Sequence, residues 1–163
     1  MLLVIDAGNT NVTFAVFDGD SIAGQWRIHT EARRTADEYG VWLTQVMEHT
    51  GIKPGQITGA ILASVVPQAL FDLRMLAKRY FHTDLVIIGD PALKPAMPVK
   101  IDNPREIGAD RLVNAYAAWN KYKQALIVLD FGTATTFDVV NGKGEYAGGV
   151  IAPGVNLSLD ALQ

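Results

Sequence analysis

Two short stretches of the chain place an aspartate, a glycine and small polar residues directly after an apolar run. The first is LLVIDAGNTN, which starts at Leu2, and the second is LIVLDFGTATT, which starts at Leu126. Glycine has no Cβ atom, so the backbone N–H groups of such a turn can approach phosphate oxygens closely. Aspartate supplies the oxygen ligands that hard cations prefer. One such stretch is an ordinary turn, but two of them predict a duplicated site for a phosphate chain and its counter-cation.

The two stretches belong to a longer internal repeat. LIVLDFGTATTFDVVNG at 126–142 matches LLVIDAGNTNVTFAVFDG at 2–19 when one residue is deleted. The aligned pairs are Asp6 with Asp130, Gly8 with Gly132, Phe14 with Phe137 and Gly19 with Gly142. Because a strand–turn–strand unit recurs along the chain, we expect a duplicated fold. The Walker and Rossmann glycine motifs, GxxxxGK[ST] and GxGxxG, are both absent from the sequence.

The apolar pattern predicts the elements that position these stretches. Strands are expected at 2–6, 12–18, 22–29, 58–65 and 84–89, within 126–142, and at 146–151. Helices are expected at about 35–51, 67–81 and 108–122. A capping box of Thr35 and Glu38 begins the first helix, and a loop is predicted by four prolines, Pro91, Pro95, Pro98 and Pro104. This order, βββαβαβ followed by a helix and βββ again, is typical of a two-domain α/β fold.

The composition limits the classes of protein to which the chain can belong. The 163 residues are 49% hydrophobic and 19% charged, with a formal net charge of −3 and no cysteine. These values are typical of a folded protein, exclude disulfides and cysteine metal sites, and argue against a broad basic face for nucleic acid. The sequence has neither a basic leader segment nor the ~20 consecutive apolar residues that would cross a bilayer. We therefore expect a cytoplasmic protein that binds no nucleic acid and no membrane.

Five motifs, in order, make the chain resemble the type III pantothenate kinases of the acetate-kinase, sugar-kinase, Hsp70 and actin superfamily. The motifs are DAGNTN at 6–11, SVVP at 64–67, NPREIGADR at 103–111, DFGTATT at 130–136 and GGVIAPG at 148–154. DAGNTN and DFGTATT resemble the two phosphate motifs of the family, and NPREIGADR resembles its pantothenate-binding motif. The resemblance implies an α/β class with the ribonuclease H-like, duplicated βββαβα architecture of actin-like ATPases. It places a first domain at 1–107, and a connecting helix with the beginning of a second, incomplete domain at 108–163.

The resemblance also implies an activity. The family phosphorylates pantothenate to 4′-phosphopantothenate with ATP, the first step of coenzyme A biosynthesis, and uses magnesium and a monovalent cation, potassium or ammonium. A homodimer is expected. Two alternatives remain open: a kinase or phosphatase of the superfamily that acts on a sugar, acetate or polyphosphate, and a non-catalytic nucleotide-binding regulator. The GADR sequence counts against the first alternative, and the three acids Asp6, Asp110 and Asp130 count against the second.

By position, the resemblance assigns a role to each motif residue. The residues assigned to ATP are Asp6, Ala7, Gly8, Asn9, Thr10, Asn11, Val12, Thr13 and Thr133, with Asp6 near the magnesium. Asp130 is assigned to the monovalent cation. The residues assigned to pantothenate are Gly108, Ala109, Asp110 and Arg111, with Asp110 as the general base. Ile101 departs from the family, which often has an aromatic residue at this position.

Asp110 and Arg111 also have structural interpretations. Asp110 could cap or stabilise the N-terminus of the helix at 108–122 instead of accepting the proton of a hydroxyl group. Arg111 could pair with the substrate carboxylate through its planar fork, or it could form a surface ion pair.

The second repeat stops after three strands and the start of a helix, NLSLDALQ. A complete second half would bring the chain to roughly 250 residues, so we expect the parent protein to continue beyond Gln163 and the adenosine-binding residues to lie outside this sequence. The strands at 125–152 alternate apolar residues that only residues 155–163 could cover. We therefore expect the isolated chain to be unstable or oligomeric.

Overall fold

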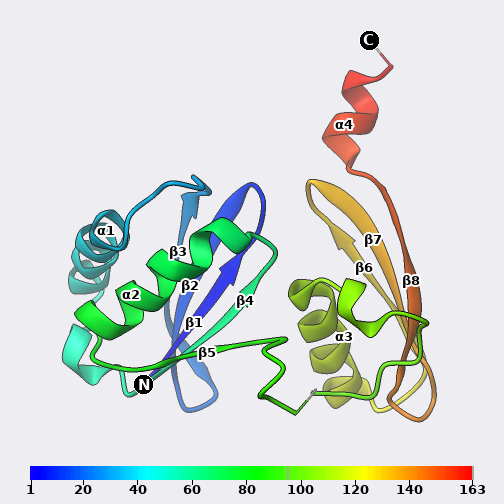
Figure 1. The fold of residues 1–163 in the computed structure, drawn as a ribbon, viewed down its shortest axis with the longest axis horizontal. Coiled ribbons are helices and arrows are strands. Elements are labelled where there is room, and N and C mark those ends of the chain that lie inside the picture. Colours follow the sequence, from blue (N-terminus) through cyan, green and yellow to red (C-terminus); the bar gives the residue numbers. More distant parts are fainter. Residues whose placement is uncertain (95, 163) are drawn as a thin grey trace. The chain divides into compact units, whose positions relative to one another are not determined.

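The computed structural model describes residues 1–94 and 96–162, so Pro95 of the predicted loop and Gln163 lie outside the described residues. The chain divides into two compact units, Met1–Ile88 and Gly89–Gln163. Figure 1 shows a sheet and helices in each unit. The domains expected at 1–107 and 108–163 follow the sequence repeat rather than these compact units, and they remain a prediction.

The first unit is a five-stranded mixed sheet with two α-helices. Its elements are β1 (Leu2–Ala7), β2 (Asn11–Asp18), β3 (Ser21–His29), α1 (Ala36–His49), β4 (Gly59–Ser64), α2 (Leu70–Tyr80) and β5 (Leu85–Ile87), with 3₁₀ turns at Pro54–Gln56 and Pro67–Ala69. The strand order is β3–β2–β1–β4–β5, in which β2 is antiparallel to β1 and β3, and β4 is parallel to β1 and β5. The predicted elements are confirmed, except that Pro67 begins a 3₁₀ turn before the α-helix, as is common at the ends of helices.

The core of the first unit explains the strand pattern. The alternate residues of β1 that are fully buried are Leu3, Ile5 and Ala7. They share one core with α1 and α2, which contact each other, whereas Asp6 points to the opposite face. The capping box predicted for α1 is confirmed, because Thr35 Oγ1 accepts a hydrogen bond from the Glu38 N–H group at 3.3 Å and the Thr35 N–H group donates to Glu38 Oε2 at 2.8 Å.

The second unit is a three-stranded antiparallel sheet with a long helix packed on it. Its elements are a 3₁₀ turn (Pro104–Glu106), α3 (Ala109–Tyr122), β6 (Leu126–Phe131), β7 (Ala134–Val140), β8 (Tyr146–Pro153) and α4 (Val155–Asp160), with the strand order β6–β7–β8. α3 contacts β6 and β7 over a small core of Met97, Ala115, Val140 and Tyr146. The described part of the proline-rich loop is irregular, as predicted, apart from the 3₁₀ turn and a bridge between Val99 and Tyr146.

Strand pairing confirms the internal repeat. The equivalent cross-strand pairs are Asp6–Thr13 and Asp130–Thr136 in the first two strands, and Asn11–His29 and Ala134–Pro153 in the second and third strands. The two repeats therefore share one register, and the second loop has one residue fewer than the first. This is the deletion that the sequence alignment requires.

One face of the second sheet is apolar and exposed. α3 covers the face that bears the buried residues Asp138 and Val140, and alternate residues point the other way. The apolar face of β6–β8 consists of Ile127, Leu129, Phe131, Phe137, Val139 and Val150, with exposed fractions from 36% to 67%. These side chains are neighbours, because Ile127 pairs with Val139 and Phe137 pairs with both Leu129 and Val150. The exposed sheet that the sequence predicted is therefore present.

We expect the isolated chain of 163 residues to self-associate through the apolar face of β6–β8. Covering one large apolar side chain is worth roughly 1.5–3 kcal/mol. Ile127→Lys places a charge in this face and should shift sedimentation toward the 17.7 kDa monomer. Ile22→Lys is the matched control, because Ile22 of β3 is 56% exposed and Ile127 is 61% exposed, and it should leave association unchanged. A wild-type chain that is folded and monomeric would contradict the prediction that this face drives self-association.

Candidate functional site

The first glycine loop joins β1 to β2 and is closed by its own backbone. The Gly8 N–H group donates to the Asn11 carbonyl at 3.0 Å. Thr30, the residue after β3, holds the loop from outside: its hydroxyl donates to the Gly8 carbonyl at 2.6 Å, and its N–H group donates to the Thr10 carbonyl at 2.9 Å. The C=O and N–H groups of one trans peptide point in opposite directions. Because the Gly8 carbonyl points to Thr30, the N–H group of the exposed Asn9 points away from it.

Asp6 is an exposed residue at the base of this loop, on the face of the sheet opposite the core that contains Leu3, Ile5 and Ala7. Its cross-strand partner is Thr13, so the two side chains lie on one face. The side chains of Ala7 and Val12 are fully buried in the core. Of the residues predicted to contact ATP, these two can therefore offer only backbone groups to a ligand.

The second glycine loop has the same closure with one residue fewer. The Gly132 N–H group donates to the Ala134 carbonyl at 2.9 Å. The residue equivalent to Thr30 is Gly154, directly after β8. A Cβ atom at position 154 would lie 2.5 Å from the Gly132 carbonyl oxygen and would overlap that of Thr133. In this repeat the loop is therefore held by close packing of the Gly132 and Thr133 backbone against Gly154.

Asp110 lies in the first turn of α3, after the N-cap residue Gly108. Its Oδ1 atom accepts a hydrogen bond from the Arg111 N–H group at 2.7 Å. The structure thus contains the helix-stabilising contact that the structural interpretation of Asp110 predicts. A carboxylate has a second oxygen with its own lone pairs, so this contact is compatible with a role in proton transfer.

The guanidinium group of Arg111 is paired with a carboxylate that sequence reasoning missed. Arg111 Nε donates to Asp138 Oδ1 at 2.8 Å, and Nη2 lies 2.6 Å from the same oxygen but makes no well-aligned hydrogen bond to it. Asp138 is 1% exposed and also accepts a hydrogen bond from the Tyr146 hydroxyl at 2.5 Å. The interpretation of Arg111 as part of a surface ion pair is therefore wrong, because its partner is buried.

These contacts determine the protonation of the groups around Asp138. Burial lowers the pKa of Arg111, but the hydrogen bond to Asp138 and its negative charge together raise it by more, so the pKa lies above its usual value. Burial, followed by the hydrogen bond to Asp138 and the charge of this carboxylate, raises the pKa of the Tyr146 hydroxyl far above its usual value. At neutral pH the arginine is therefore a cation and the tyrosine is a proton donor.

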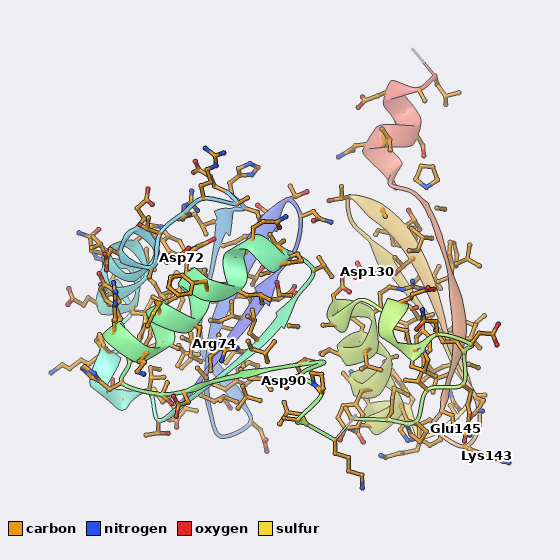
Figure 2. The ribbon with its side chains drawn as sticks, viewed as in Figure 1. Asp72, Arg74, Asp90, Asp130, Lys143 and Glu145 are labelled. Atoms are coloured by element: carbon orange, nitrogen blue, oxygen red, sulfur yellow. The ribbon has the colours of Figure 1, made fainter. Side chains whose placement is uncertain are left out.

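Asp130 is the penultimate residue of β6, and it lies on the same face of the sheet as Asp138. Asn114 lies one turn along α3 from Asp110, and its Nδ2 atom donates to Asp130 Oδ2 at 3.1 Å; Figure 2 shows Asp130 beside α3. Thr136 is the cross-strand partner of Asp130, and its hydroxyl lies 3.4 Å from Asp138 Oδ2. The predicted site residues that this arrangement brings together are Asp110, Arg111 and Asp130.

Taken together, the predicted residues are divided between the two units. The loop from Asp6 to Thr13 belongs to the first unit, whereas Thr133 and the motif at 108–111 belong to the second. Ile101, the position that departs from the family, packs against the small core of the second unit.

Four residues with positioning contacts were not predicted: Thr30, Asn114, Asp138 and Tyr146. A signal existed for Asp138, because the internal repeat aligns it with Ala15, a buried residue of β2. An acid at a position that is buried in the other repeat needs a partner. Nothing in one sequence identifies Arg111 as that partner.

Neither a preformed metal centre nor a membrane-spanning helix occurs among the described residues. No three His, Asp or Glu side chains of this part of the chain are grouped to hold an ion, and no helix in it is long and apolar enough to cross a bilayer. A cation at Asp6 or Asp130 would therefore need further ligands from water, from the backbone or from a bound phosphate.

The chain matches known proteins along almost its whole length. Residues 2–163 match the family described as type III pantothenate kinase. The type III pantothenate kinase of Rhodospirillum rubrum is 57% identical over 99% of this chain and 63% of its own length. The chain thus spans less than two thirds of the length of this curated relative.

Solved structures share the fold at low sequence identity. The reductive activator for a corrinoid, iron–sulfur protein matches with a TM-score of 0.59 over 91% of this chain and 30% of that chain, at 15% identity. The Ppx/GppA phosphatase of Aquifex aeolicus matches with a TM-score of 0.52 over 98% of this chain and 54% of that chain, also at 15% identity. These similarities concern the fold alone, and they confirm the predicted α/β, actin-like architecture. With the match over residues 2–163 and the 57% identity to a curated member, the chain belongs to the type III pantothenate kinase family.

Proposed function

We propose that the protein phosphorylates pantothenate with ATP and forms 4′-phosphopantothenate, which begins coenzyme A biosynthesis. The observation that supports this most is the placement of Asp110 and Arg111 in the first turn of α3, with Asp130 bonded to the same helix through Asn114. Membership of the family supports the same reaction. Because the chain spans 63% of the length of its relative, we propose the activity for the complete protein.

The proposed reaction needs a proton acceptor and a group that holds the substrate anion. The primary hydroxyl of pantothenate attacks the γ-phosphorus of ATP, the bond from this phosphorus to the bridging oxygen breaks, and the hydroxyl proton passes to the carboxylate of Asp110. Arg111 offers an oriented guanidinium group to the pantothenate carboxylate, and Gly108 and Ala109 place backbone groups next to it. The products are ADP and 4′-phosphopantothenate, and Asp110 then returns its proton to water.

We assign the ATP phosphates to the two glycine loops, that is, to residues 6–13 and to Thr133. The outward N–H group of Asn9 and the polar side chains of the first loop support this assignment. Asp6 is an exposed carboxylate at the base of that loop, and magnesium in phosphoryl-transfer sites takes one or two carboxylates together with water and phosphate oxygens. The residues therefore fit a magnesium ion, which when bound neutralises phosphate charge. Asp130, the equivalent exposed carboxylate, is assigned to potassium or ammonium.

The remaining features of the proposal concern partners and location. We propose a cytoplasmic homodimer that acts on a small molecule and binds neither nucleic acid nor membrane; the net charge of −3 supports the exclusion of nucleic acid. A non-catalytic regulator of the same fold would need neither a general base nor a holder for a substrate carboxylate. The chain has candidates for both, which favours the enzyme.

Removing the proposed base should separate turnover from nucleotide binding. In the full-length protein, Asp110→Asn should lower the turnover of pantothenate by ~10²–10⁴-fold, while the dissociation constant for ATP changes little. Asp20→Asn, at an exposed aspartate in the turn before β3, is the control and should retain wild-type kinetics. Turnover is measured with a coupled ADP assay, and ATP binding by calorimetry. An Asp110→Asn variant that loses ATP binding as strongly as turnover would exclude this role.

A change at Thr30 should alter the binding of ATP and not that of pantothenate, because Thr30 holds the first glycine loop. Thr30→Val keeps the shape of the side chain but removes the hydrogen bond to the Gly8 carbonyl, and the loss of one neutral hydrogen bond predicts a roughly 2- to 10-fold increase in KM for ATP. KM for pantothenate should stay the same. Thr30→Ser retains the hydroxyl and should behave like the wild type. An unchanged KM for ATP in Thr30→Val would mean that this bond does not shape the loop.

The monovalent cation gives a further test of the site. We expect the full-length protein to require potassium or ammonium and to have low activity when sodium is the only monovalent cation. Asp130→Asn removes a charged ligand and should raise the potassium concentration needed for half-maximal activity, whereas Asp160→Asn, at an exposed aspartate of α4, should not. Full activity in sodium alone would rule out this assignment of Asp130.

A further inference from the structure

Asp138 is a buried carboxylate outside the predicted site, and its close contacts meet at one oxygen. Oδ1 accepts hydrogen bonds from Arg111 Nε at 2.8 Å and from the Tyr146 hydroxyl at 2.5 Å, and Arg111 Nη2 lies 2.6 Å away. Burying an ion pair is costly, and apolar residues of the same volume often stabilise a protein as well or better. The pair therefore calls for a role other than stability.

The contacts determine which nitrogens of the guanidinium group are engaged by Asp138. Nε and Nη2 of Arg111 form one edge, which faces Asp138, whereas Nη1 and Nη2 form another. Nη2 is buried and makes no well-aligned hydrogen bond, although buried donors normally find an acceptor. The Arg111 side chain is 14% exposed. Because Nη2 is buried, Nη1 is the nitrogen left for a substrate carboxylate, and it can donate without displacing Asp138 from Nε and Nη2.

Gly149 makes room for this arrangement. It is the cross-strand partner of Asp138 on β8. A Cβ atom at position 149 would overlap Arg111 Nη2 and would lie 2.7 Å from Asp138 Oδ1. The guanidinium group therefore lies against the strand in a space that only a glycine leaves open.

Tyr146 holds the same oxygen of Asp138 and is itself fixed in place. Its side chain is 1% exposed and belongs to the small core of the second unit. Its backbone is bonded to the loop that precedes α3: the Tyr146 N–H group donates to the Pro98 carbonyl at 2.9 Å, and its carbonyl accepts from the Lys100 N–H group at 2.8 Å. Through Tyr146, Asp138 is connected both to the core and to the segment that leads into the pantothenate motif.

We propose that Asp138 and Tyr146 are positioning residues that hold the guanidinium group of Arg111 through Nε and Nη2, so that Nη1 is directed toward the carboxylate of the acceptor substrate. This inference rests on the proposed function, in which Arg111 binds that carboxylate. An arginine side chain that is already held loses less conformational freedom when the substrate binds. The consequence is selectivity for an acceptor that bears a carboxylate over the same molecule with a neutral amide.

The test compares pantothenate with its primary amide in the full-length protein. The ratio of the inhibition constant of the amide to KM for pantothenate measures how strongly the carboxylate is recognised. Asp138→Asn keeps the volume of the side chain and removes its charge, and we expect this ratio to fall about 10-fold or more. Tyr146→Phe removes one hydroxyl, and we expect a fall of about 3-fold. In both variants KM for pantothenate should rise, while kcat and KM for ATP stay close to the wild type.

Tyr122→Phe is the matched control, because Tyr122 is an exposed residue at the end of α3, and this variant should leave the ratio unchanged. A merely structural role predicts a lower thermal midpoint with an unchanged ratio. An unchanged ratio in both variants overturns the inference. If Asp138→Asn does not fold, an unchanged ratio in Tyr146→Phe alone overturns it. A wild-type protein that does not phosphorylate pantothenate overturns the proposed function instead, and this outcome is recognised without any variant.

Discussion

Each half of this chain depends on a glycine N–H group that closes a loop two residues after the aspartate near the end of a strand. Gly8 donates to the Asn11 carbonyl, and Gly132 donates to the Ala134 carbonyl. The bond fixes the end of one strand beside the start of the next, so the aspartate and the polar loop residues occupy defined positions. Every residue that we assign to ATP lies in one of these loops or in the strands that they join.

The two repeats hold their loops by different means. In the first unit Thr30 donates two hydrogen bonds to the loop. In the second unit the carbonyl groups of Gly132 and Thr133 pack directly against Gly154, which has no side chain. The repeats also differ within the sheet, where Ala15 fills space in one and Asp138, its equivalent, binds Arg111 in the other. The same backbone therefore supports two chemistries, which we infer to be phosphate binding in both loops and recognition of a carboxylate in the second unit alone.

The strands and the start of α1 were predictable, because burial in a sheet alternates with a period of two and a capping box is a local pattern. The contacts of Thr30 with Gly8 and of Arg111 with Asp138 were not, because they join residues that are 22 and 27 positions apart. Such contacts depend on the register and twist of neighbouring strands, which one sequence does not reveal. The residues assigned to the site were found only through motifs, whereas the residues that hold them are scattered between the motifs.

The central claim is that both glycine loops bind the phosphates of ATP. Amide hydrogen exchange of the full-length protein, measured residue by residue with and without magnesium and ATP, tests it most directly. We predict slower exchange at 7–13 and at 131–136 when the nucleotide is present, and unchanged exchange at 53–58 around the 3₁₀ turn of the first unit. Slower exchange in only one of the two loops, or in neither, would contradict the claim.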